Sequence, residues 1–335
     1  MEKCCESHHS VSARLHVKFG MPSHCAGRSR ESRAVAAIIV AFAASRPLVA
    51  GAQELGKFVA HAAQSRWSFE PWELVCLGLS AGLYTFGLAR LWTRVGRGRG
   101  VSVAEVSAFV AGWLAIVAAL LSPLDAMGQA LFCVHMVEHE LLMIVAAPLL
   151  VLGRPLAVWA WALPAGWRGP IGAFFHRPGW RVPWLLLTGP FWAWVLHALA
   201  LWLWHIPALF EAALDNDAVH ALQHISFLGT ALIFWWSVLG GVTRHDRGIA
   251  SLSLFTTMVH TGALGALLTL STVVWYPSYA ASASAWGLTP LEDQELGGII
   301  MWVPAGLVYI IVGIVLASRW LAEPRRSDPR RAKRA

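Results

Sequence analysis

Charged residues are scarce in this sequence. Only 13% of its 335 residues are Asp, Glu, Lys or Arg, whereas 57% are hydrophobic. A soluble globular protein carries about 25% charged residues, so this chain lacks roughly half of the charge that a water-exposed surface requires. The shortage excludes a cytosolic enzyme, a disordered regulator and a small secreted module. It predicts a membrane protein with several spans.

Cysteine and tyrosine are also rare. The 5 cysteines are scattered, which excludes a disulfide framework. Only 4 tyrosines accompany 19 tryptophans, and indole rings favour the interface between membrane and water. The net charge of +7 does not indicate a nucleic-acid partner, because basic residues of membrane proteins more often record orientation. We therefore expect this chain to lie in the lipid bilayer and to bind no nucleic acid.

Long apolar runs fill the sequence after residue 70. A helix of about 20 apolar residues crosses the hydrocarbon core, and seven runs are of about this length. They cover residues 72–92, 101–121, 129–152, 183–204, 218–239, 249–274 and 296–318. The third run is the least regular, because Glu138, His139 and Glu140 interrupt it and must lie on a longer helix. The predicted fold class is an all-α, polytopic transmembrane helical bundle of about seven spans.

A shorter apolar segment near the N-terminus has the features of a secretory signal peptide. Residues 34–44 are apolar, follow three arginines and precede the small residues Ala50-Gly51-Ala52. Cleavage is expected after Ala52. The predicted parts are residues 1–52 as extension and signal peptide, 53–71 as an extracytoplasmic segment, 72–318 as the seven-helix transmembrane domain and 319–335 as a basic cytoplasmic tail.

The basic residues indicate the orientation of the spans. Segments 90–100, 154–181 and 241–248 and the tail from residue 319 together hold 17 Lys and Arg. The alternate segments, 53–71, 122–128, 205–217 and 275–295, hold only Lys57 and Arg66. Because Lys and Arg accumulate on the cytoplasmic side, we predict an inner (plasma) membrane protein with its mature N-terminus outside and its C-terminus inside.

Histidines collect near the outer face in this topology. His135 and His139 lie in the third span, His205 ends the fourth, and His220 and His224 begin the fifth. Each of the two pairs has the spacing H-x-x-x-H, which places both imidazoles on one face of a helix. Neutral imidazole is the commonest ligand for transition metals. The sequence therefore predicts a metal site formed by these five histidines.

Other side chains are candidates to complete or support this site. The carboxylates are those of Glu138, Glu292 and Asp293, the soft thioethers include Met136 and Met301, and His260 lies nearer the middle of the membrane. Polar groups inside a membrane span are costly and usually functional. The alternative is a hydrogen-bonded network that holds the helices together, which is our interpretation of His197 and leaves His260 as a distant supporting residue. The methionines are also normal packing residues.

An ordered set of motifs resembles the multi-pass CtaG family of cytochrome c oxidase assembly factors. The motifs are Ser122-Pro123-Leu124, His135-Met136 with His139, Ala147-Pro148-Leu149-Leu150 with Gly153 and Pro155, Trp204-His205-Ile206-Pro207, His220 through His224, Phe234-Trp235-Trp236, and Asp293-Gln294 with Gly297-Gly298-Ile299-Ile300-Met301-Trp302. The resemblance implies a role in maturing a haem–copper oxidase, at the step that supplies its copper. One residue departs from the pattern: Glu138 precedes the second histidine, where an amide is expected.

Together these observations lead to one functional hypothesis. Copper arriving from outside binds transiently to His135, His139, His220 and His224, assisted by His205 and Asp293, with Glu138, Met136, Met301 and His260 in supporting positions. The ion then passes to the core subunit of cytochrome c oxidase. This role needs no turnover chemistry, so we predict an assembly factor and not an enzyme.

Three alternatives remain open at this level. Two histidines on facing helices could ligate a b-type haem in an electron-transfer protein. A di-metal oxygenase or hydrolase would need more carboxylates near the histidines. A copper importer would need polar residues that continue toward the cytoplasmic side, for which His260 is the one indication. Zinc or iron could replace copper, and the oligomeric state is left open.

Overall fold

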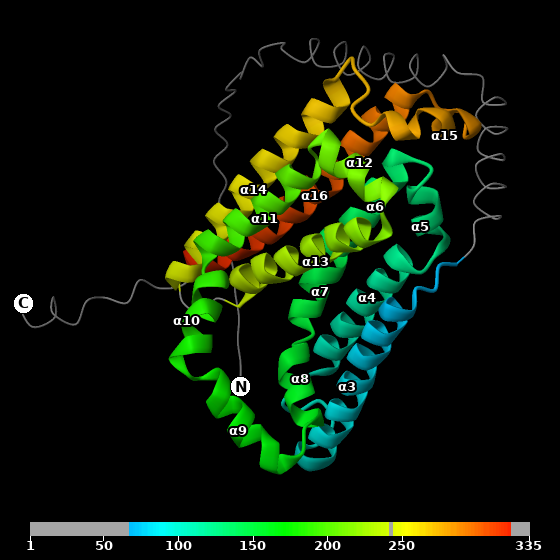
Figure 1. The fold of residues 1–335 in the computed structure, drawn as a ribbon. Helices are drawn as coiled ribbons and strands as arrows, with labels where there is room; N and C mark the ends of the chain where they lie inside the picture. The colour runs from blue at the N-terminus through cyan, green and yellow to red at the C-terminus, as the bar shows by residue number, and fades with distance from the viewer. Residues whose placement is uncertain (1–66, 241–243, 323–335) are drawn as a thin grey trace, which may run out of the picture. The chain divides into compact units, whose positions relative to one another are not determined.

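The computed structural model describes residues 67–240 and 244–322, and within these ranges every regular element is helical (Figure 1). The elements are α3 (Pro71–Val95), α4 (Val103–Leu120), α5 (Pro123–Gly128), α6 (Phe132–Glu140), the π-helix η1 (Leu141–Ala146), α7 (Ala147–Leu152), α8 (Pro155–Ala162), α9 (Ala165–Phe175), α10 (Pro178–Leu187), α11 (Pro190–Trp204), α12 (Pro207–Asp215), α13 (Asp217–Leu239), α14 (Arg244–Leu270), the 3-10 helix η2 (Pro277–Tyr279), α15 (Ala280–Ala285) and α16 (Pro290–Ala322). The expected signal peptide, most of segment 53–71 and the tail after residue 322 lie outside the described residues.

Six helical stretches are long and apolar enough to cross a membrane. They are Pro71–Val95, Val103–Leu120, Phe132–Leu152, Asp217–Leu239, Gly248–Leu270 and Pro290–Ala322. The consecutive helices α10 and α11 make a seventh if they count as one span. Many large side chains on these helices are exposed, among them Leu79, Phe191 and Ile314, as lipid contact requires. The prediction of an all-α polytopic bundle is confirmed.

The fourth predicted span is not one straight helix. The structure has α10 and α11 in its place, bent by 64° relative to each other. Gly189 adopts an extended conformation at the break, and Pro190 follows it. Proline cannot donate the helical hydrogen bond and disfavours a helical conformation in the residue before it, so the helix restarts there. The connection before it, residues 164–183, is also helical and forms α9 and part of α10.

The third span agrees with the prediction that its polar residues lie on a longer helix. Helix α6 carries Glu138, His139 and Glu140, and it continues without interruption through η1 into α7. The π-turn follows the polar residues directly. Such wide turns occur inside α-helices most often at functional sites.

The last span begins earlier than predicted. Helix α16 starts at Pro290 and not at residue 296, so Glu292 and Asp293 lie in its first turn. Negative charge there is stabilised by the helix dipole. Gly297 and Gly298 permit a close approach of helices, because a Cβ on Gly297 would collide with Phe132 of α6 and one on Gly298 would collide with Thr269 of α14.

Candidate metal centre

The two H-x-x-x-H pairs face each other across the helices α6 and α13. The ring centroids of His135 and His220 are 5.3 Å apart, and those of His139 and His224 are 5.4 Å apart. Within each pair the centroids are separated by 4.3 Å, as one helical turn dictates. Two pairs of imidazoles that are more than 80 residues apart in sequence therefore share one small volume, as the spacing and the topology predicted.

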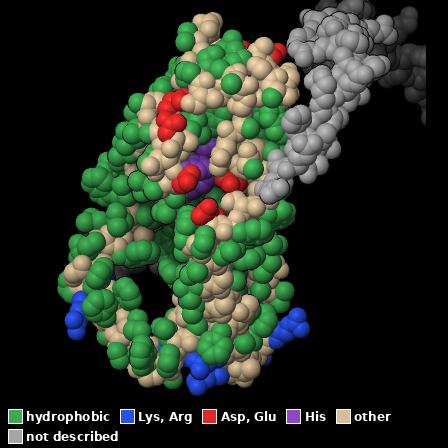
Figure 2. All heavy atoms as spheres, turned by 45° about the vertical axis from the view of Figure 1, so that its right-hand side comes forward, with side chains coloured by type: hydrophobic (Ala, Val, Ile, Leu, Met, Phe, Trp, Pro, Cys, Tyr) green, Lys and Arg blue, Asp and Glu red, His purple; other side chains and the backbone are tan. Residues whose placement is uncertain are grey.

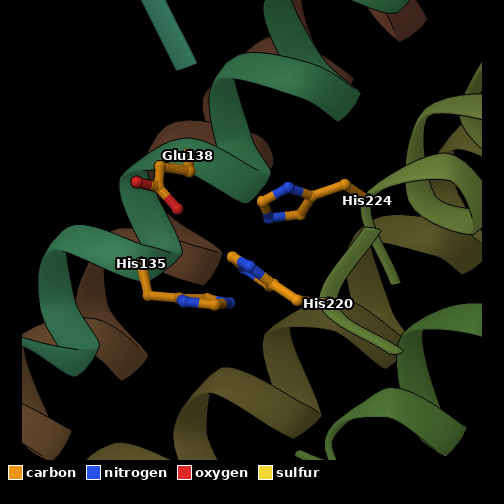
Figure 3. A group of neighbouring side chains, drawn as sticks. All are labelled: His135, Glu138, His220 and His224. Atoms are coloured by element: carbon orange, nitrogen blue, oxygen red, sulfur yellow. The ribbon is translucent and has the colours of Figure 1, made fainter. Parts of the chain in front are cut away.

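A tighter group within this volume has the composition of a metal site. It consists of His135 and Glu138 from α6 and His220 and His224 from α13, and one ligand atom of each lies within 4.8 Å of the others (Figure 3). Ligand atoms of one tetrahedral ion with bonds of about 2.0–2.1 Å lie roughly 3.4 Å apart. The group is thus slightly wider than a bound site, by an amount that side-chain rotation covers.

The polar atoms of this group lack other partners. Both carboxylate oxygens of Glu138 and the Nε2 atoms of His220 and His224 are buried and have no hydrogen-bond partner among the described residues. Glu138 itself is fully buried. A buried polar atom without a hydrogen-bond partner destabilises the folded protein, and a buried charge without a partner destabilises it more. A bound cation is the partner that suits a carboxylate and imidazole lone pairs at once.

Gly128 leaves the space that the Glu138 carboxylate occupies. A Cβ at position 128 would lie 2.6 Å from Oε1 of Glu138. The backbone oxygen of Gly128 also accepts a hydrogen bond of 3.0 Å from the hydroxyl of Tyr279. The short helix α5 therefore ends in a residue that both fits against the carboxylate and is fixed in place.

His139 and His205 form a second row behind this group. Their ring centroids are 6.4 Å apart, and Nδ1 of His205 lies 2.7 Å from the backbone oxygen of Leu201. This contact orients the ring so that Nε2 is its free atom. The backbone oxygen of His205 in turn accepts a hydrogen bond from the Tyr276 hydroxyl. Burial lowers the pKa of His205 to about 4, so its imidazole is neutral at neutral pH, as a ligand must be.

Asp293 lies apart from the four ligand atoms. Its two carboxylate oxygens accept hydrogen bonds of 2.8 and 2.9 Å from the backbone N–H groups of Phe132 and Cys133. Helix α6 has no side-chain cap of its own at Leu131, so the carboxylate from α16 caps it instead. The structure thus corrects the expected position of Asp293: it holds the first turn of the helix that carries His135, Glu138 and His139.

The remaining supporting candidates are also placed away from the group. Met136 and Met301 are buried in the apolar core, and Met136 faces Gly297. His260 packs against the ring of Trp194 at 5.7 Å. His197 stacks on Phe234 at 5.2 Å and lies 3.3 Å from the Thr230 hydroxyl, which fits its interpretation as part of a hydrogen-bonded network.

Some residues of this region were missed or underrated in the sequence. Glu138 was expected as a candidate ligand or a supporting residue, and it is one of the four grouped side chains. Gln223, fully buried on α13, was not considered, although its place three residues after His220 puts it beside the same face. The carboxylates of Glu70, Glu73, Asp125 and Asp217, which line one cavity with His220, were also missed, because they lie at the starts of three helices that are far apart in sequence.

Comparison with known proteins gives the family. The family model described as cytochrome c oxidase caa3 assembly factor (Caa3_CtaG) matches residues 82–323. This chain belongs to the Caa3_CtaG family. The match contains all five clustered histidines, so the resemblance inferred from the motifs is confirmed, and the protein is a multi-pass membrane protein of an oxidase assembly family.

Curated relatives occur in mycobacteria. The chain is 30% identical over 265 residues to an uncharacterized protein of Mycobacterium bovis and to one of Mycobacterium tuberculosis, covering 75% of this chain and 39% of each relative. It is 28% identical over 284 residues to an uncharacterized protein of Mycobacterium leprae, covering 80% of this chain and 41% of the relative. The chain thus spans about two fifths of the length of these relatives. No solved structure matches it.

Proposed function

We propose that this Caa3_CtaG protein assists cytochrome c oxidase assembly by binding copper at the cluster of His135, Glu138, His220 and His224 and passing it to the oxidase core subunit. The observation that carries the proposal is the convergence of four ligand side chains, three of them buried and His220 partly buried, with ligand atoms within 4.8 Å of one another. Copper is cargo in this role and not a resident cofactor. No bond of a substrate is made or broken, so the protein acts as a carrier and not as an enzyme.

The donor atoms of the cluster influence which oxidation state of copper it binds. The cluster offers imidazole nitrogen and carboxylate oxygen, whereas the thioethers of Met136 and Met301 are packed in the core. Soft sulfur ligands select Cu(I), while imidazole also suits Cu(II) and Zn(II). This donor set favours capture of a divalent ion, and it makes zinc the natural competitor.

His139 and His205 supply a route for transfer. The ring centroid of His139 lies 5.4 Å from that of His224, and the ring centroid of His205 lies 6.4 Å from that of His139. An ion held by few ligands exchanges more readily than one in a closed site. Replacing ligands one at a time along this second row would let the ion leave without being exposed to lipid.

The charge distribution supports an outward-facing site in the plasma membrane. Figure 2 shows acidic side chains around the histidines and basic side chains at the other end of the helices. By the positive-inside rule the basic end is cytoplasmic. The histidine cluster then faces the side from which copper and the oxidase copper centre are reached.

Metal content and oxidase maturation test the proposal together. The purified full chain, exposed to Cu(II) and freed of excess ion, should hold about one copper per chain by elemental analysis. The double variant His220→Ala/His224→Ala should lose it, and His176→Ala, an exposed histidine outside the cluster, should retain it. In cells, His135→Ala/His139→Ala should lower oxidase activity and oxidase copper. Unaltered oxidase activity and copper content in that variant would refute the copper role.

A copper importer is the second candidate, because buried imidazoles continue inward from the cluster. His197 is 1% exposed, and both ring nitrogens of His260 lack a hydrogen-bond partner among the described residues. Uptake of copper into vesicles that contain the protein distinguishes import from delivery outside. Delivery predicts loading of the chain without accumulation in the lumen.

A further inference from the structure

A cavity of about 650 Å³ lies directly beside the histidine cluster. Its wall includes four carboxylates, those of Glu70, Glu73, Asp125 and Asp217. Glu70 and Asp217 are exposed, whereas Glu73 and Asp125 are partly buried. We call this cavity the acidic vestibule. Figure 2 shows the corresponding hollow, with histidine at its bottom and acidic side chains around it.

The fold explains why these acids are present. Glu70 and Glu73 belong to the start of α3, Asp125 to the first turn of α5 and Asp217 to the first turn of α13. An acid at each helix start is stabilised by the helix dipole. The helix dipole explains each acid separately, but it does not explain why the three helix starts surround one cavity. Bringing like charges together is unfavourable.

The carboxyl of Asp125 lies in surroundings that disfavour its charged form. Burial, followed by the negative charges of Glu70 and Asp217, raises the pKa of its carboxyl to about 6. Among the described residues, no Lys or Arg lines the vestibule. The described arginines, such as Arg90, Arg154 and Arg319, lie in segments that alternate in the topology with those that bear the acids. Within the described part of the chain, the vestibule is therefore a concentration of acidic side chains.

A separate observation links the vestibule to a ligand. His224 lines the same cavity, is only 7% exposed, and its Nε2 atom has no hydrogen-bond partner among the described residues. His220 lines it as well. Two of the four grouped ligand side chains thus form the inner wall of the cavity whose outer wall is acidic.

We infer that the acidic vestibule is the entry path by which a hydrated divalent cation reaches the histidine cluster. The inference rests on the proposed function, because it supplies the route to the site proposed there. A cleft of one charge sign concentrates counter-ions and raises association rates by about 10- to 1,000-fold, an effect that salt screens. The same field repels anionic copper chelates, so the aqua ion is the species selected.

Association kinetics test this path. The full chain in detergent is mixed with Cu(II) in a stopped-flow instrument at several ionic strengths, and the change in tryptophan fluorescence is followed. Glu70→Gln/Asp217→Asn removes two exposed charges of the vestibule and should slow association about 10-fold at low salt. Asp215→Asn is the matched control, since Asp215 is exposed near Asp217 but does not line the vestibule. It should associate at the wild-type rate.

The outcomes separate the two proposals. If wild-type protein binds copper but its association rate is independent of ionic strength, or if the double variant associates as fast as wild type, the entry path is refuted and the metal site stands. If the wild-type protein binds neither Cu(II) nor Zn(II), the proposed function is refuted. The salt dependence of the wild-type rate needs no variant, so it decides the matter even if the double variant does not fold.

Discussion

Two groups of histidines lie inside this helical bundle, and they differ in a way that burial alone does not reveal. In the first group, called the outer group because two of its members border the acidic vestibule, the rings of His135, His220 and His224 converge with a carboxylate, and His220 and His224 line the vestibule. In the inner group His197 contacts the Thr230 hydroxyl and stacks on Phe234, while His260 packs on Trp194. Both groups consist of buried and partly buried rings, yet only the outer one combines several ligand atoms with an access path. Convergence and access, more than burial, distinguish a candidate metal site from packing.

Variants that lack histidines of one group or the other should show the largest difference between the two groups. His220→Ala/His224→Ala should weaken copper binding by at least about 100-fold, because two of four ligands are lost. His197→Ala should change the affinity by less than about 3-fold and instead lower thermal stability, because it leaves a cavity beside Phe234. Isothermal titration with Cu(II) measures both affinities. Equal losses in the two variants would show that the groups are functionally alike.

The cap on α6 tests how the outer group is held in place. Asp293→Asn keeps the size of the side chain but loses the charge and one of the two acceptors for the N–H groups of Phe132 and Cys133. We expect a loss of about 2 kcal/mol in stability and about 10-fold weaker copper binding, since supporting residues orient ligands. Thermal unfolding in detergent and copper titration measure these effects. Glu295→Gln on the same helix is the control, and an equal effect there would contradict a capping role.

The fit between Gly128 and Glu138 gives a smaller test of the same group. Gly128→Ala places a methyl group where the carboxylate now lies, so the carboxylate must move and copper affinity should fall about 10-fold, or about 1.4 kcal/mol. The control is Gly229→Ala, because an added Cβ there meets no atom within 4 Å. Copper titration with Glu138→Gln should give a similar loss. A normal affinity in both Gly128→Ala and Glu138→Gln would remove Glu138 from the site.

Substitution of Asp125 should have the smallest effect on stability, and this effect should depend on pH. Its carboxyl has a pKa raised from 3.8 to about 6 by burial and by nearby charge, with Glu70 and Glu73 of α3, Glu138 of α6 and Asp217 of α13 facing it. A raised acid pKa means that the folded state prefers the protonated form. The stability from this group is therefore complete below about pH 4 and is lost as the pH rises through about 6.

The variant Asp125→Asn should remove this dependence. After allowance for partial exposure of the side chain, we expect the metal-free variant to be more stable than wild type by about 1 kcal/mol at pH 7.5 and equal to it at pH 4. Thermal unfolding at the two pH values measures the difference. A variant that is less stable at both values would mean that the carboxylate stabilises the fold.

Much of the fold followed from local pattern. Apolar length located the spans, and H-x-x-x-H spacing placed each histidine pair on one helical face. The predictions that the structure corrected also rested on neighbouring residues alone. The break at Gly189-Pro190 was overlooked because apolar composition continues across it, and Asp293 was assigned to the metal because its hydrogen bonds to Phe132 and Cys133 join residues 160 positions apart.

The sequence by itself determined that this chain lies in a membrane, which residues cross it and which imidazoles share a helix face, because hydrophobic length and helical periodicity are properties of neighbouring residues. Only the tertiary structure decided that Glu138 joins the histidines, that Asp293 caps α6 and that three helix starts surround one acidic vestibule. Those relations depend on how helices pack against one another. Packing is set by the shapes of side chains that are distant in sequence, such as Gly297 against Phe132 and Gly128 against Glu138.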